Sequence, residues 1–70
     1  MEENVTMTVK ELAKGDFFTK RKIQYPNENQ VWVRGEYDRS ERRYECHRFG
    51  DVNDVQYIPG NKVVFCDFMF

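Results

Sequence analysis

The C-terminal segment constrains the fold more than any other part of the chain. Only Lys62 and Asp67 are charged among its nine residues, Lys62 to Phe70, and the remainder is apolar. Because successive side chains of a strand point to opposite faces, a strand with this sequence has to be covered on both sides. In a chain of 70 residues, either the rest of the chain wraps around it or a partner caps it. This predicts a small β-barrel or sandwich, built as one domain over residues 1–70.

Composition allows a real core but argues against a dedicated polyanion-binding protein. Aromatic residues make up 16% of the chain, and each can bury about 150–250 Å². The formal net charge is −1, which does not favour binding of a polyanion by the chain as a whole. Residues 17–50 are nevertheless basic, with eight Lys or Arg against five acidic residues, and both ends are acidic.

The expected location is the cytoplasm. No stretch reaches the roughly 18 apolar residues of a membrane span, and residues 1–4 lack the basic and apolar regions of a signal peptide. We therefore expect no membrane contact, and Cys46 and Cys66 should be reduced. Because cysteine is often buried, both are expected to be small core residues.

About five strands and one helical turn are predicted. The sequence from Thr8 to Glu11 fits a capping box, which predicts a helical turn over 9–13 after a brief strand over 5–9, with Gly15 as its C-cap. Residues 59–61 (Pro-Gly-Asn) predict either a type II turn or a Gly-Asn hairpin. The other strands are predicted at 17–23, 30–37, 42–49, 55–58 and 63–70. Short antiparallel strands without long helices favour a mostly β, five-stranded antiparallel SH3-like barrel or sandwich.

The polar turn at residues 38–41 predicts a strand register. With Asp38 opposite Glu41, Val33 lies opposite Cys46 on the inner face. On the outer face the same register pairs Glu36 with Arg43, Arg34 with Glu45, and Trp32 with His47. Two of these pairs are oppositely charged, which would contribute about 0.2–1 kcal/mol each. A slip of one residue would exchange the two faces.

That register predicts an aromatic ring among basic side chains on the outer face. The candidate binding face comprises Lys20, Lys22, Trp32, Arg34, Arg39, Arg42, Arg43 and His47. A ring that stacks a base contributes about 1–3 kcal/mol, and the cations neutralise phosphates. The alternative is a solvated face, on which Glu36 and Glu45 pair with the arginines and Trp32 shields an apolar surface.

Catalytic and metal-binding sets are not expected. His47 is the only histidine and follows Cys46 directly. Neighbouring strand residues point to opposite faces, so these two side chains neither form a nucleophile–base pair nor share a zinc ion. A pair of Cys66 and His47 would require both side chains on one face. We expect a protein that is not an enzyme and that needs no cofactor or metal.

Five segments carry a resemblance to known sequences: 8–12, 14–18, 31–39, 51–53 and 60–68. In these segments the chain resembles a group of short, uncharacterised bacterial proteins. The resemblance implies a compact, mostly β domain and implies no activity. The stretch from Lys14 to Phe17 is also similar to the first turn of some SH3-like domains that bind nucleic acid or protein.

The sequence thus predicts a binding or accessory module. Trp, Tyr and Arg dominate interface hot spots, and the 62–70 strand would offer a pairing edge to another chain unless it lies inside the core. The balanced charge favours a protein partner, including a second copy, over nucleic acid. Single-stranded nucleic-acid binding through Trp32, Arg34 and Arg43 is the alternative.

Overall fold

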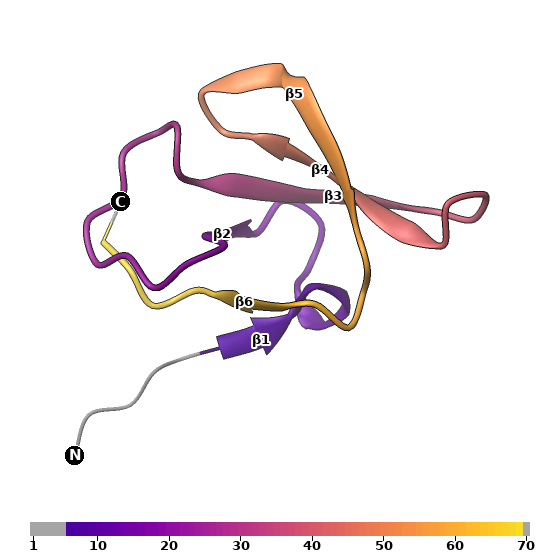
Figure 1. Cartoon of the computed structure of the whole chain (residues 1–70), viewed down its shortest axis with the longest axis horizontal. Helices are drawn as coiled ribbons and strands as arrows, with labels where there is room; N and C mark the ends of the chain where they lie inside the picture. Colours follow the sequence, from indigo (N-terminus) through magenta and orange to yellow (C-terminus); the bar gives the residue numbers. More distant parts are fainter. Residues whose placement is uncertain (1–5, 70) are drawn as a thin grey trace.

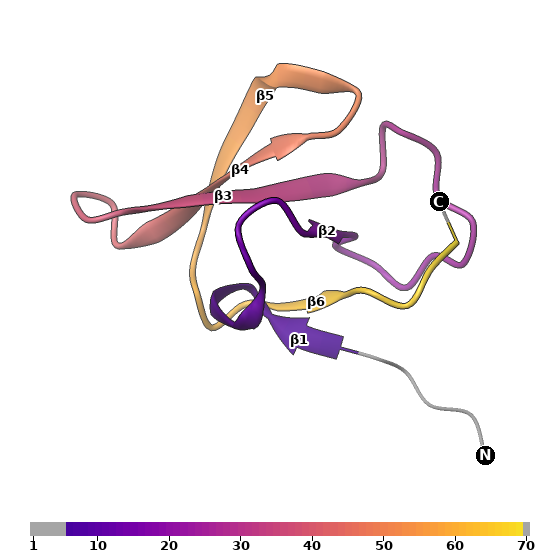
Figure 2. The same cartoon turned by 180° about the vertical axis from the view of Figure 1, so that it is seen from behind.

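The computed structural model describes residues 6–69, which form two antiparallel sheets. The two-stranded sheet pairs β1 (Thr6–Thr8) with β6 (Val63–Phe65). The four-stranded sheet has the order β2-β3-β4-β5 and comprises β2 (Phe17–Phe18), β3 (Trp32–Asp38), β4 (Arg43–Arg48) and β5 (Asp51–Ile58). In both Figure 1 and Figure 2 the small sheet lies below the large one, and the β3–β4 turn projects from the body. The mostly β prediction is confirmed, whereas a closed, five-stranded SH3-like barrel is not.

The predicted helical turn is present but short. The 3-10 helix η1 (Val9–Glu11) ends at Leu12, so Gly15 is not its C-cap and that prediction is wrong. The Glu11 carboxylate accepts a hydrogen bond from the Thr8 N–H at 2.9 Å, as the capping box predicts. Gly15 instead lies in a later turn with φ 95°, where its N–H donates to the Arg34 carbonyl at 2.8 Å.

Three strand predictions differ from the structure by more than two residues at one end. The strand predicted at 17–23 pairs with β3 only through Phe17 and Phe18, because the next residue, Thr19, bonds to the other sheet. Its N–H and carbonyl form hydrogen bonds with Phe65 at 2.9 and 3.0 Å. The terminal strand ends at Phe65, while β5 begins at Asp51, four residues before its predicted start. Val5 and Phe70, which the predicted end strands included, lie outside the described residues.

The predicted β3–β4 register is wrong because the turn is longer than expected. Asp38 Oδ1 accepts hydrogen bonds from the N–H groups of Ser40 (2.8 Å) and Glu41 (3.2 Å). The Arg42 N–H donates to the Asp38 carbonyl at 2.7 Å, so Asp38 lies opposite Arg43 rather than Glu41.

A bulge shifts the register of this hairpin once more. It lies between Arg34 and Tyr37 and contains Gly35. Beyond it the observed partners are Trp32 with Arg48, Val33 with His47, and Arg34 with Cys46. The two faces of β3 are therefore exchanged relative to the prediction, so that Trp32 points inward and Val33 outward, whereas Cys46 and His47 on β4 lie on the faces predicted for them. The predicted cross-strand ion pairs do not form: Glu36 pairs with Lys14, and the Arg34 guanidinium lies 4.2 Å from the centroid of the Tyr44 ring.

The core lies between the two sheets. Its buried cluster consists of Val9, Leu12, Phe18, Trp32, Cys46, Ile58 and Val64. Cys66 packs against this cluster and is partly exposed, and both thiols are free. The turn after β5 is closed by the Lys62 N–H, which donates to the Pro59 carbonyl at 3.1 Å. Gly60 and Asn61 lie at its centre, so it is not the type II turn centred on Pro59 and Gly60, and because it leads into the other sheet it does not form the Gly-Asn hairpin either. Within residues 6–69, no helix has the length and apolarity needed to cross a membrane.

Candidate functional site

The predicted exposed ring is wrong, because Trp32 belongs to the core. Only 4% of its surface is exposed, since the observed register points it inward beside Cys46. His47 pairs with Val33 and therefore lies on the opposite face of the sheet. Arg34 stacks on Tyr44 instead of joining the ring of Trp32. The structure therefore does not bring Trp32, Arg34 and His47 together in one face, contrary to the prediction from the sequence.

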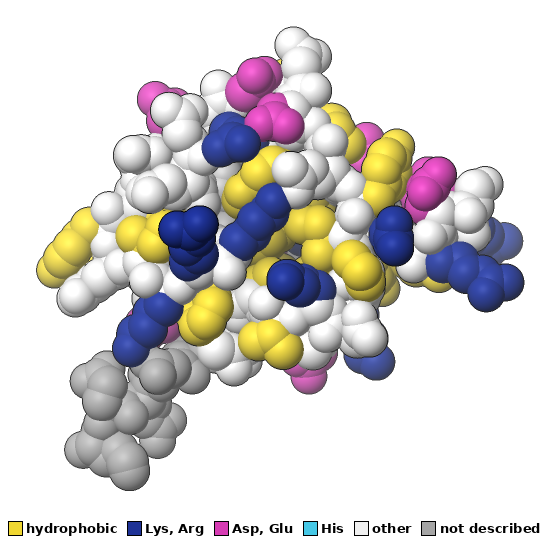
Figure 3. All heavy atoms as spheres, viewed as in Figure 1, with side chains coloured by type: hydrophobic (Ala, Val, Ile, Leu, Met, Phe, Trp, Pro, Cys, Tyr) yellow, Lys and Arg dark blue, Asp and Glu magenta, His cyan; other side chains and the backbone are white. Residues whose placement is uncertain are grey.

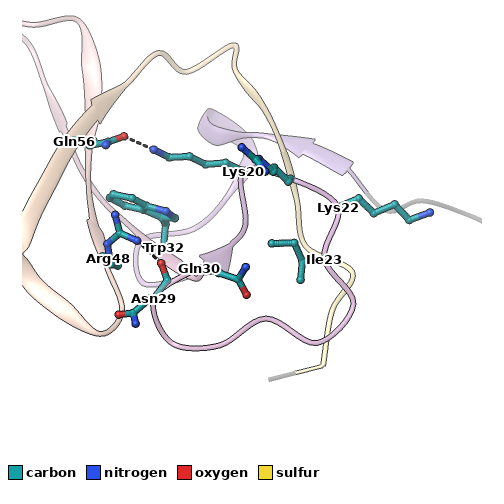
Figure 4. Close-up of a pocket in the computed structure, with 9 residues that line it drawn as sticks. Lys20, Lys22, Ile23, Asn29, Gln30, Trp32, Arg48 and Gln56 are labelled. Carbon is teal, nitrogen blue, oxygen red and sulfur yellow. Dashed lines mark hydrogen bonds between the residues drawn. The ribbon is translucent and has the colours of Figure 1, made fainter.

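The other predicted cations fall into two groups. Arg39 and Arg42 lie in the β3–β4 turn, and Arg43 begins β4 beside it. Lys20 and Lys22, in contrast, line an open pocket of about 500 Å³ beside Trp32. The residues lining this pocket, which we call the Trp32 pocket, are Lys20, Arg21, Lys22, Ile23, Asn29, Gln30, Trp32, Arg48 and Gln56 (Figure 4).

Two cations lie directly against the indole ring in this pocket. Lys20 Nζ is 4.1 Å from the ring centroid of Trp32, and Arg48 Cζ is 4.8 Å from it. Figure 4 shows the two side chains reaching the ring from different segments, one just after β2 and the other at the end of β4. A cation this close to an indole is attracted by about 0.5–2 kcal/mol. The indole therefore serves as a platform for cations.

Hydrogen bonds hold both cations in place. The ammonium group of Lys20 donates to the side-chain carbonyl of Gln56. Arg48 donates from Nε to Asp54 Oδ2 at 2.7 Å and from Nη1 to the Asn29 carbonyl. Partial burial lowers the pKa of Lys20 below its usual value, and the nearby charge of Arg48 lowers it further.

Charge is unevenly distributed over the surface. On the face shown in Figure 3, Lys and Arg side chains cross a partly hydrophobic centre, and Asp and Glu side chains lie toward the rim. None of the nine residues that line the Trp32 pocket is acidic. The net charge of −1 therefore conceals a locally basic surface.

Sequence reasoning missed Arg21, Arg48 and the amide side chains of this pocket. Arg48 is opposite Trp32 in the true register, and finding it would have required both the correct turn length and the bulge at Gly35. Asn29 and Gln30 come from a loop that carries no periodic signal. Gln56 lies on β5 opposite Cys46; the predicted 55–58 strand contains it, but no register with the 42–49 strand was predicted.

The outer face of the large sheet carries a second feature, a row of side chains across all four strands. Phe17 pairs with Val33, Val33 with His47, and His47 with Val55. Phe49 extends the row, since its ring meets that of Phe17 edge-to-face at 5.3 Å. Phe17, Phe49 and Val55 are each about 40% exposed. We call Phe17, Val33, His47, Phe49 and Val55 the outer row.

The geometry and the pKa values do not favour either cysteine as a nucleophile. Cys46 points into the core, whereas its neighbour His47 lies in the outer row, so they do not face each other. Burial raises the pKa values of the Cys46 and Cys66 thiols, which disfavours the thiolate. Residues 6–69 contain no cluster of His, Cys, Asp and Glu side chains suited to a metal ion.

Comparison with known protein families, with characterised proteins and with solved structures gives no match to this chain.

Proposed function

We propose that the protein is a non-enzymatic binding module that docks another protein through the outer face of its four-stranded sheet. The outer row is the observation that supports this proposal. A domain of 70 residues has little apolar surface to spare, yet Phe17, Phe49 and Val55 remain about 40% exposed on one face. Contiguous apolar surface of this kind is typical of interaction sites.

The edge strand next to the outer row strengthens this assignment. β5 is the last strand of the four-stranded sheet and, with eight residues, its longest. An exposed edge strand is a template for pairing with another chain. The 62–70 segment is less suitable, because Phe65 already bonds Thr19 on one side and pairs with Thr6 on the other.

The chemistry of the cysteines agrees with a binding role rather than a catalytic one. Both thiols have raised pKa values, and the only histidine lies on the other side of the sheet from Cys46. We place the module in the cytoplasm, where both cysteines would remain thiols.

A charge placed in the outer row tests the docking face. Val55→Lys introduces a cation at an exposed position of β5 and should abolish association without unfolding the domain. Sedimentation equilibrium of the purified protein measures self-association, and affinity capture with the immobilised protein measures binding of a different partner. We expect the wild-type protein either to self-associate or to capture a partner. We expect Val55→Lys to lose that association.

Val63→Lys is the matched control, since Val63 is also an exposed strand valine (51%) but lies on β6, in the other sheet. It should associate as the wild type does. The docking proposal fails if the wild type neither self-associates nor captures a protein, or if all three proteins associate equally.

A further inference from the structure

The Trp32 pocket is the middle member of three adjoining hollows. It shares Lys20 and Gln56 with a hollow of about 370 Å³ that extends to Lys62. On the other side it shares Lys22 with a hollow of about 360 Å³ that reaches Asp67 and Met69. Cations therefore recur along a surface longer than any single pocket, from Lys62 through Lys20 to Lys22.

The cations at the centre of this surface are already fixed before any ligand binds. Lys20 lies on the Trp32 ring and bonds Gln56, and Arg48 is held by Asp54 and by the Asn29 carbonyl. Long basic side chains normally lose conformational entropy when they bind a ligand. In this protein the fold already restricts the side chains of Lys20 and Arg48, so little further conformational entropy is lost on binding and the site is preorganised.

The same arrangement places like charges close together. Burial is the main cause of the lowered pKa of Lys20, and the charges of Arg48 and Lys62 lower it further, whereas Asp54 and Cys46 oppose them. Of the four basic residues in the Trp32 pocket, only Arg48 has a carboxylate bound to it among the described ion pairs. An anion in the pocket would relieve the repulsion between the cations.

We infer that this surface binds the phosphate groups of single-stranded nucleic acid. Arg and Lys are the side chains that contact phosphates, and the pocket offers four of them with no lining carboxylate. A series of adjoining open hollows suits a chain of phosphates better than one isolated phosphate ester. Because Trp32 is buried under Lys20 and Arg48, recognition uses the backbone and does not need a base to stack on the indole.

This inference does not rest on the proposed docking face. Trp32 and Arg48 point to the inner side of the large sheet, and the outer row lies on its other side. Loss of one activity by mutation should leave the other unchanged.

The first experiment is a titration at several salt concentrations. Fluorescence anisotropy of a labelled single-stranded oligothymidylate reports binding, and Trp32, the only tryptophan, reports occupation of the pocket. We expect binding at low salt that weakens steeply as salt is added. Unlabelled mononucleotide and inorganic phosphate, added as competitors, distinguish a polymer backbone from a free phosphate. Displacement by either at the same phosphate concentration would overturn the polymer assignment.

Matched arginine variants locate the site. Arg21→Gln removes a cation of the Trp32 pocket, and Arg39→Gln removes one from the distant β3–β4 turn; both residues are exposed. Arg21→Gln should weaken binding several-fold and reduce the salt slope by about 1, whereas Arg39→Gln should leave both unchanged. Lys20→Gln should cause a larger loss and should change Trp32 emission. Absence of binding at low salt, or equal losses in the Arg21 and Arg39 variants, would refute the inference.

Discussion

Among individual residues, Gly35 sets the geometry of the large sheet. It lies in the β3 bulge, and a Cβ built on it would overlap the backbone carbonyl oxygen of Glu45 on β4. A glycine inside a strand often marks such a close approach of two backbones. Gly35 therefore permits the bulge that brings Trp32 opposite Arg48 and so forms the Trp32 pocket.

We expect Gly35→Ala to destabilise the protein by about 3 kcal/mol, because the clash involves backbone atoms that cannot move aside without breaking the β3–β4 pairing. Urea denaturation followed by Trp32 fluorescence measures this change. Gly15→Ala is the control: its Cβ would meet no atom within 4 Å, but φ is 95°, so only backbone strain of about 1–2 kcal/mol is expected. A Gly35 variant as stable as the wild type would show that the bulge does not depend on glycine.

At the level of elements, the β3–β4 turn combines a stabilising cap with a strained residue. The Asp38 carboxylate caps the turn, while Arg42 adopts φ 57°, the left-handed conformation that favours glycine. The strain at Arg42 accompanies the hydrogen bond from its N–H to the Asp38 carbonyl.

Arg42→Gly should therefore stabilise the protein by about 0.5–1 kcal/mol, since the relief of strain exceeds the additional entropy of glycine in the unfolded chain. Arg39→Gly, in the same turn but without a positive φ, should instead destabilise it by up to about 1 kcal/mol. Urea denaturation midpoints of the two variants measure both effects. Equal destabilisation by the two substitutions would contradict the role assigned to Arg42.

The same turn explains how far the sequence could predict the structure. The locations of β3 and β4 follow from their apolar and aromatic residues, and η1 follows from its capping box. The register of β3 and β4 cannot be predicted in this way. Arg42 gives no sequence signal for a left-handed residue, and the bulge at Gly35 depends on a contact with the neighbouring strand. A shift of one residue at Trp32 exchanged the two faces of β3, while the faces predicted for Cys46 and His47 on β4 hold. Lys20, Lys22 and Trp32 were thus grouped correctly and His47 was placed on the correct, outer face, but Trp32 was placed on that face although it points into the core.

At the scale of the whole molecule, the two sheets share one core. Val9, Leu12 and Val64 come from the η1 and β6 side, and Phe18, Trp32, Cys46 and Ile58 come from or adjoin the large sheet. Thr19, itself fully buried, bonds Phe65 through its backbone and the Arg21 carbonyl through its hydroxyl at 2.6 Å. These connections imply that neither sheet is stable alone, as expected for a domain this small.

Val64→Ala tests whether the molecule unfolds as one unit. Val64 is fully buried on β6, so the loss of its methyl groups and the resulting cavity should cost about 2 kcal/mol. Because the sheets share a core, the urea midpoint should fall equally when it is followed by Trp32 fluorescence, which reports the large sheet, and by far-ultraviolet circular dichroism, which reports both. The exposed neighbour Val63, changed to Ala, should cost less than about 1 kcal/mol. A circular dichroism transition that shifts while the Trp32 transition stays in place would show that the small sheet separates from the large one, and the shared core would then not be the unit of folding.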